Sequence, residues 1–254
     1  MTDTKIIFVM PFYKGGDLYQ LLTKRKKFDE TTVAFYLVQV ANMLDYLHSN
    51  NILYRDLKPE NLLLGNDGYL ILCDFGLCKI IEEQKELSNS FCGSAEYISP
   101  EIIAGYGYNI MSDWWSFGIL CYELLFGIPP FYDNSVDRIF NLISTTQLNF
   151  PSNINISDDT KTFIIRLLKK NPNERLGGYK EIIQHPFFSS VVNEKINNRS
   201  TKTPIPMNIS NDNLTLNFDE MYINIKPEII ENIEPQDMTK INEFQSQFEE
   251  LKTE

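Results

Sequence analysis

The sequence is poor in the side chains that build zinc sites. It has two His, at positions 48 and 185, and four Cys, at positions 73, 78, 92 and 121. No two Cys have C-x-x-C spacing, so nothing indicates a structural zinc site. Scattered Cys in apolar segments are typical of reduced core thiols in a cytosolic protein. The composition therefore predicts a cytoplasmic location, with the nucleus as the alternative.

Positive charge and long apolar runs are also scarce. Lys and Arg number 23 against 34 Asp and Glu, a net charge of −11. Proteins that bind nucleic acid or anionic lipid surfaces normally show the opposite balance. The most apolar stretch, 116–131, contains Glu123, Gly127 and two prolines, so we expect no membrane span. The first five residues lack a signal-peptide pattern.

What is present is enough apolar material for a large core, 43% of 254 residues. Residues 6–10 predict a short buried strand. From Asp29, a candidate N-cap, to His48 the apolar spacing predicts a long amphipathic helix. Residues 62–64 and 69–72 flank Gly-Asn-Asp-Gly and predict a hairpin. Further helices are expected at 112–126, 136–145 and 158–169.

After Phe188 the character of the sequence changes. Residues 190–254 carry 12 acidic and six basic side chains, a net of −6, and their apolar periodicity is weak. Asn, Ser, Thr and Pro are frequent in this part. The composition predicts a tail rather than a separate domain.

The chemistry-bearing stretch is Tyr-Arg-Asp-Leu-Lys-Pro-Glu-Asn at 54–61, followed after the hairpin by Asp-Phe-Gly at 74–76. The hairpin folds back, so both motifs should lie at one edge of the sheet. Two carboxylates, a Lys and an Asn then converge: Asp56, Asp74, Lys58 and Asn61. Such a set suits phosphoryl transfer, which needs metal held on phosphates, an oriented hydroxyl and compensation of charge.

These motifs resemble the catalytic loop and metal-binding motif of protein kinases. The resemblance implies that Asp56 accepts the substrate hydroxyl proton and that Lys58 neutralises the transferred phosphoryl group. It also implies ATP as the phosphate donor and Mg²⁺ held by Asn61 and Asp74. The lysine two residues after Asp56 is the serine/threonine-kinase form of the loop.

Three later segments extend the resemblance. Residues 93–101 resemble the end of a kinase activation segment, 113–118 the helix that anchors the catalytic loop, and 172–177 a late structural loop. The resemblance implies a buried ion pair of Glu101 with Arg175 and a structural role for Asp113.

Details narrow the resemblance to the AGC group. They are Tyr54 in place of a common His, the run Ser-Phe-Cys-Gly-Ser at 90–94, and Asn-Phe-Asp-Glu-Met-Tyr at 217–222. The likeness is greatest to the Akt, SGK and ribosomal S6 kinase branches. It implies a mainly α (α+β) fold, a kinase-like large lobe with a small β-hairpin and then an extended C-terminal tail. The implied boundaries are 1–188 for hinge and large lobe and 189–254 for the tail.

Residues 9–18 resemble the kinase hinge. Met10 would be the gatekeeper, the backbones of Pro11 and Tyr13 would face adenine, and Asp17 would face the ribose. The remaining lining of the implied nucleotide site is Leu63 and Cys73.

No Gly-rich phosphate loop or strand Lys occurs in these 254 residues. We therefore expect Met1 to be an internal methionine of a longer kinase and the chain alone to be nearly inactive. The alternative is a catalytically inactive lobe that acts as a binding or regulatory module; a small-molecule kinase is a weaker third interpretation. An exposed apolar face is expected around Val9, Leu18 and Phe75.

The resemblance also implies regulation and substrate preference. Ser90 would be phosphorylated by an upstream activating kinase and paired with Arg55 and Lys79. Ser94 would contact Asp56 and Lys58 as part of the peptide platform. Asp17, Glu60 and Glu123 would bind Arg on the N-terminal side of the target Ser or Thr. Phe244 and Phe248 form either a degenerate hydrophobic motif or a plain acidic amphipathic end.

Overall fold

The computed structural model describes residues 10–81, 87–152, 154–191, 193–209 and 215–218. The chain forms two compact units, one of Tyr13–Phe218 and one that joins Met1–Phe12 to Asp219–Glu254. The first unit carries the fold discussed below. Residues 6–9 of the expected strand lie outside the described residues, as do Phe244 and Phe248.

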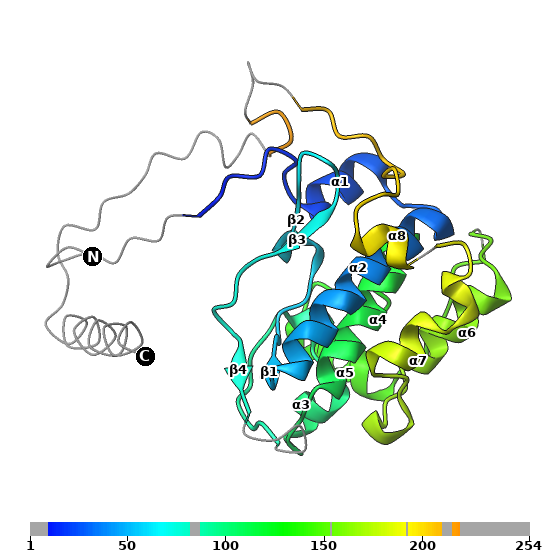
Figure 1. Cartoon of the computed structure of the whole chain (residues 1–254). Coiled ribbons are helices and arrows are strands. Elements are labelled where there is room, and N and C mark those ends of the chain that lie inside the picture. Colours follow the sequence, from blue (N-terminus) through cyan, green and yellow to red (C-terminus); the bar gives the residue numbers. More distant parts are fainter. Residues whose placement is uncertain (1–9, 82–86, 153, 192, 210–214, 219–254) are drawn as a thin grey trace, which may run out of the picture. The chain divides into compact units, whose positions relative to one another are not determined.

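The first unit is mainly helical, with two small antiparallel sheets (Figure 1). Its helices are α1 (Leu18–Arg25), α2 (Glu30–Ser49), α3 (Pro100–Ala104), α4 (Met111–Phe126), α5 (Val136–Thr145), α6 (Asp158–Leu167), α7 (Tyr179–Ile183) and α8 (Asn193–Asn197). Its strands are β1 (Ile52–Leu53), β2 (Leu62–Leu64), β3 (Leu70–Leu72) and β4 (Lys79–Ile80). Short 3-10 turns are η1 (Pro59–Asn61), η2 (Ala95–Tyr97), η3 (Pro172–Glu174) and η4 (Pro186–Phe188). The predicted fold class is confirmed.

Helix α2 begins where the sequence predicts. The Oδ1 of Asp29 accepts the Thr32 amide at 2.8 Å and so satisfies one of the free amides of the first turn. Most of the helix is buried because it packs against α4 on one side and against α7, α8 and β3 elsewhere. The side-chain oxygen of Gln39, on this helix, accepts the backbone amide of Leu70, and this bond fixes the hairpin to the helix.

Helix α4 is buried along nearly its whole length, from Ser112 to Phe126. Trp114 and Trp115 are both fully buried. At Gly118 a Cβ would lie 2.8 Å from Leu167 and Leu168, so the glycine lets α6 approach closely. A helix that is buried on all sides belongs in the centre of a domain, and α4 is that centre.

The hairpin places the two motifs of the catalytic stretch together. Strand β2 pairs with β3 in the register Leu62 with Leu72, and Gly68 in the turn has a φ of 77°. Strand β1 pairs with β4, so the residues that follow the Asp-Phe-Gly motif return to the start of the catalytic loop, while β3 before the motif pairs with β2 at its end. The two loops therefore share one edge of the unit.

The segment after the large lobe crosses back over the hairpin, as Figure 1 shows in yellow and orange. Arg199 forms an ion pair with Asp67 at 2.7 Å and lies over the ring of Tyr69, 5.3 Å from its centroid. Farther on, Asn217 Nδ2 donates to the carbonyl of Lys14 at 2.9 Å. These contacts attach Arg199 and Asn217 to the lobe.

None of the helices that the structure describes is long and apolar enough to cross a bilayer.

Candidate active site

The catalytic loop is held by one buried carboxylate. Asp113, in the first turn of α4, accepts the backbone amides of Tyr54 at 3.0 Å and Arg55 at 2.8 Å. His48 Nε2 bonds to the same carboxylate at 2.8 Å. Arg55 has a φ of 71°, a conformation unfavourable for a residue with a side chain. The carboxylate thus supports a strained backbone directly before Asp56.

Four side chains meet at the end of this loop. Asp56 Oδ2 lies 3.1 Å from Lys58 Nζ and accepts Asn61 Nδ2 at 2.9 Å. Ser94 Oγ, from the activation segment, donates to Asp56 Oδ1 at 3.0 Å and accepts Lys58 Nζ at 2.9 Å. A carboxylate fixed by donors, with an ammonium and a hydroxyl beside it, can orient a second hydroxyl and accept its proton.

The residues expected to hold Mg²⁺ are also adjacent. The amide of Cys73 donates to the Asn61 carbonyl at 3.0 Å, which sets Asp74 next to Asn61. The Asn61 Nδ2 is used by Asp56, so its Oδ1 is the atom left for a cation. One carboxylate and one amide oxygen suit Mg²⁺, which keeps waters and substrate phosphates as its other ligands.

No group of three or more His, Cys, Asp or Glu with metal-site spacing occurs among the described residues. A Mg²⁺ site built from two protein ligands does not need one.

The predicted nucleotide-lining residues are partly brought together. Asp17 pairs with Leu63 through an isolated bridge, and its Oδ1 accepts the Gln20 amide at 2.8 Å as the N-cap of α1. Cys73 Sγ donates to the Asn61 carbonyl at 3.4 Å. Tyr13 belongs to the same unit, whereas Met10 and Pro11 belong to the other unit.

Ser90 lies beside Arg55, as expected. Arg55 Nη1 donates to Ser90 Oγ at 2.6 Å and to the hydroxyl of Tyr108 at 3.1 Å. The Tyr108 hydroxyl in turn donates to the Ser90 carbonyl at 2.9 Å. Tyr108 was not among the predicted site residues, because it reaches Ser90 through a bridge to Ser88 and has no local sequence signal. Lys79 is on β4, and no contact recorded among the described residues joins it to Ser90.

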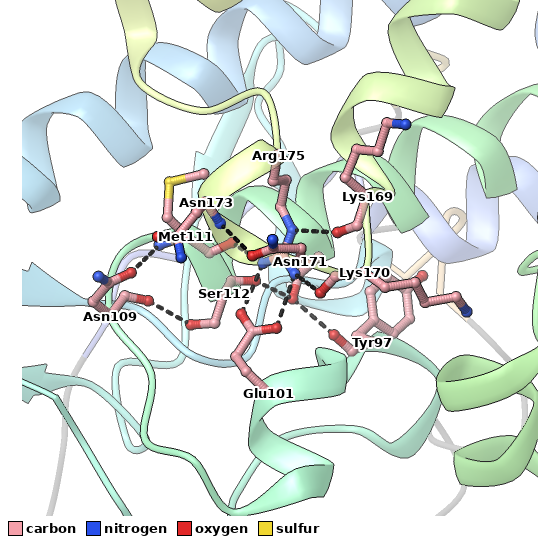
Figure 2. Close-up of polar contacts among 11 residues, drawn as sticks. Tyr97, Glu101, Asn109, Met111, Ser112, Lys169, Lys170, Asn171, Asn173 and Arg175 are labelled. Atoms are coloured by element: carbon pink, nitrogen blue, oxygen red, sulfur yellow. Dashed lines mark hydrogen bonds and ion pairs between the residues drawn. The ribbon is translucent and has the colours of Figure 1, made fainter.

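The predicted pair of Glu101 with Arg175 is bidentate, with distances of 2.7 and 2.8 Å, and both side chains are buried (Figure 2). The guanidinium also donates to the carbonyls of Met111, Lys169 and Lys170. Figure 2 shows how α3, the start of α4 and the loop before η3 converge on this arginine. The pair joins the end of the activation segment to the core.

The acids expected to bind substrate arginine differ in exposure. Glu60 is exposed on η1, whereas Glu123 is buried near the end of α4 and accepts the hydroxyl of Tyr97. Burial raises the pKa of Glu123 to about 8, and Glu60 and Glu96 add to the rise. Although the Glu60 side chain is partly exposed, desolvation by its neighbours, and then the charges of Asp17 and Asp56, raises its pKa. Glu60 therefore interacts electrostatically with both of the other predicted acids.

Comparison with known proteins gives the family. The protein kinase domain family matches residues 1–188. Serine/threonine-protein kinase YPK1 of Saccharomyces cerevisiae is 40% identical over 225 residues, 88% of this chain and 33% of that protein. The RAC family serine/threonine-protein kinase homolog of Dictyostelium discoideum is 38% identical over 229 residues, 90% of this chain and 51% of that protein.

Serine/threonine-protein kinase sgk-1 of Caenorhabditis elegans is 39% identical over 225 residues, 87% of this chain and 48% of that protein. The chain thus spans between a third and a half of these relatives. A match across the whole large lobe, with relatives of one kind, confirms the resemblance predicted from the motifs. The chain belongs to the protein kinase domain family, in its AGC group.

Proposed function

We propose that the chain carries the catalytic machinery of a kinase that transfers phosphate from ATP to Ser or Thr in protein substrates. The observation that carries the proposal is the cluster of Asp56, Lys58, Asn61 and Ser94, joined by contacts of 2.9–3.1 Å. Relatives named as serine/threonine-protein kinases support the same activity.

In the proposed reaction the substrate hydroxyl lies against Asp56, which accepts the proton as the oxygen attacks the γ-phosphorus of ATP. The bond between this phosphorus and the ADP oxygen breaks, and Lys58 offsets charge on the transferred group. Asn61 and Asp74 would hold Mg²⁺, which supplies neutralisation of the phosphate oxygens when bound. Ser94 keeps Asp56 oriented before the substrate arrives.

The test uses the chain fused to the N-terminal lobe of a relative such as sgk-1. Transfer of labelled phosphate to a peptide should fall at least about a hundredfold in Asp56→Asn, because a positioned base contributes roughly that much. The exposed Asp137→Asn is the control and should leave turnover unchanged. Equal turnover in Asp56→Asn and the parent would refute the proposal.

We also propose that the 254 residues by themselves transfer phosphate very slowly. They contain no Gly-rich loop and no strand Lys to hold the α- and β-phosphates. The alternative function is that of a binding or regulatory module that docks substrates without phosphorylating them. Comparing the chain alone with the fusion separates the two: a module would bind peptides but stay inactive in both.

The proposed substrates carry Arg on the N-terminal side of the target residue. Asp17 and Glu60 supply carboxylates that guanidinium groups can pair with, and Glu123, whose pKa is raised to about 8 by burial, would pair on losing its proton. An upstream kinase would phosphorylate Ser90, next to Arg55. We place the protein in the cytoplasm, with the nucleus as the alternative, because its Cys are free thiols.

A further inference from the structure

Four consecutive cations stand out in this acidic chain. Lys24, Arg25, Lys26 and Lys27, here called the basic run, are all exposed in a chain of net charge −11. No ion pair between one of them and a carboxylate occurs in the part of the chain that the structure describes. The proposed reaction makes no use of them.

The basic run lies at the end of α1, the helix that begins at the Asp17 cap. Lys26, with a φ of 72°, reverses the chain, and the buried Phe28 fixes the turn. The Phe28 amide donates to the Leu124 carbonyl at 2.9 Å. The basic run is therefore anchored to the last turn of α4.

Gly127 shows how close the two segments are. The Lys26 carbonyl lies so near Gly127 that a Cβ there would have no room. Gly127 ends α4 by donating its amide to the carbonyl of Glu123 at 2.7 Å. One turn of helix thus separates the basic run from Glu123, a proposed arginine-binding acid. Figure 1 shows α1 above β2 and β3, the strands next to the catalytic loop.

Under the proposed function, the target hydroxyl of a peptide binds at Asp56 and Ser94, and its arginines bind at Glu60, Asp17 and Glu123. A peptide whose N-terminal part continues past these acids along α1 would reach the basic run.

We propose that the basic run binds acidic side chains of the substrate, on the N-terminal side of its arginines. This inference rests on the proposed arginine preference and refines it. The preferred substrate then has acidic residues first, arginine next, and the target Ser or Thr last.

The length of α1 sets the spacing. Eight helical residues span about 12 Å, which an extended peptide covers in roughly four residues. The acidic residues should therefore lie three to five positions before the first arginine.

The physical advantage is discrimination. A set of carboxylates alone attracts any cationic peptide. Cations beyond these carboxylates repel a basic N-terminal extension of the peptide and attract an acidic one.

The test is binding of fluorescent peptides to the 254-residue chain, followed by anisotropy at low and high salt. Three peptides are used. The first has an acidic block followed by Arg and the target Ser, the second has a block of Gln in place of the acidic block, and the third has the Gln block and no Arg. The acidic block should tighten binding about five- to tenfold at low salt, the size expected for a few exposed ion pairs. High salt should remove most of this gain.

The variant Lys24→Gln, Arg25→Gln, Lys27→Gln should abolish the gain and leave the arginine effect intact; Lys26 is kept because of its backbone conformation. The control Lys161→Gln, Arg166→Gln, Lys180→Gln removes three cations from α6 and α7 and should keep the gain. Circular dichroism of both variants checks that each is folded.

The failures are distinguishable. Arginine-dependent binding with no effect of the acidic block overturns this inference and leaves the proposed substrate preference standing. Binding that depends neither on the arginines nor on the acidic block contradicts both this inference and the proposed arginine preference. An equal loss in the two triple variants shows net-charge attraction and overturns the inference. Sedimentation of the chain with phosphatidylserine vesicles, if only the basic-run variant loses it, would assign the run to a lipid surface. This result would also overturn the inference.

Discussion

The Asp113 carboxylate accepts the backbone amide of Arg55 at 2.8 Å, across 58 positions of sequence. Through this bond, and the adjacent one from Tyr54, the central helix α4 holds the loop that carries Asp56. The same Arg55 extends its guanidinium to Ser90 in the activation segment. One residue therefore connects the core, the catalytic loop and the proposed phosphorylation site.

Replacing Asp113 by Ala should destabilise the chain by about 3 kcal/mol, because two backbone amides and His48 lose a buried acceptor. Urea unfolding of the variant and of the parent measures the change. The exposed Asp137→Asn should stay within about 0.5 kcal/mol of the parent. If Asp113→Ala lowers the free energy of unfolding no more than this control does, the catalytic loop keeps its conformation without the bonds to Asp113.

The main elements of the fold could be predicted because their signals are local. The apolar spacing after Asp29 and the Asp-Gly turn predicted α2 and the hairpin with errors of one or two residues. Helix α1 was not predicted, since its eight residues are followed by charges and carry little periodicity. Leu18 was expected on an exposed face and is fully buried, because α1 packs on η1 and β2.

The site residues also divide into those that a local motif predicts and those that only tertiary packing brings together. Asp56, Lys58 and Asn61 lie within six positions, so their convergence could be predicted from one motif. Tyr108 beside Ser90 and Tyr97 beside Glu123 could not, because each pair is formed by tertiary packing between distant segments. The exposed Glu60 and the buried Glu123 also look alike in sequence, yet only the latter bonds to a tyrosine inside the lobe.

Breaking the pair of Glu101 with Arg175 on one side should be worse than removing both charges. Arg175→Met leaves the Glu101 carboxylate buried without its partner, at a cost of about 3–5 kcal/mol. The double variant Glu101→Leu, Arg175→Met has no buried charge and should recover part of that loss. A double-mutant cycle by urea unfolding measures the coupling; strictly additive losses would contradict it.

Phosphorylation of Ser90 should raise the activity of the fusion kinase. A phosphate adds about −1.5 to −2 charges next to the Arg55 guanidinium and orders the segment against the catalytic loop. Ser90→Ala should therefore show low turnover that an upstream kinase cannot raise. Ser144→Ala, an exposed serine on α5, is the control. Activation of Ser90→Ala to the level of the parent would exclude the role.

The buried Glu123 carboxyl should make stability depend on pH. Its pKa is about 8 in the folded chain, raised from 4.5 by burial, so the folded state holds a proton that the unfolded state has lost. Between pH 4.5 and 8 the unfolded state binds fewer protons, and the free energy of unfolding should fall as pH rises, by about 1.4 kcal/mol per pH unit from this group. Glu123→Gln keeps a neutral side chain that can accept the Tyr97 hydroxyl, and should lose this slope. Urea unfolding of both proteins at pH 5, 6, 7 and 8 isolates the Glu123 contribution as the difference between the two curves, since all other groups are common to both. Parallel curves over this range would mean that Glu123 is ionised in the folded chain, and Tyr97 would then donate to a carboxylate rather than to a neutral acid.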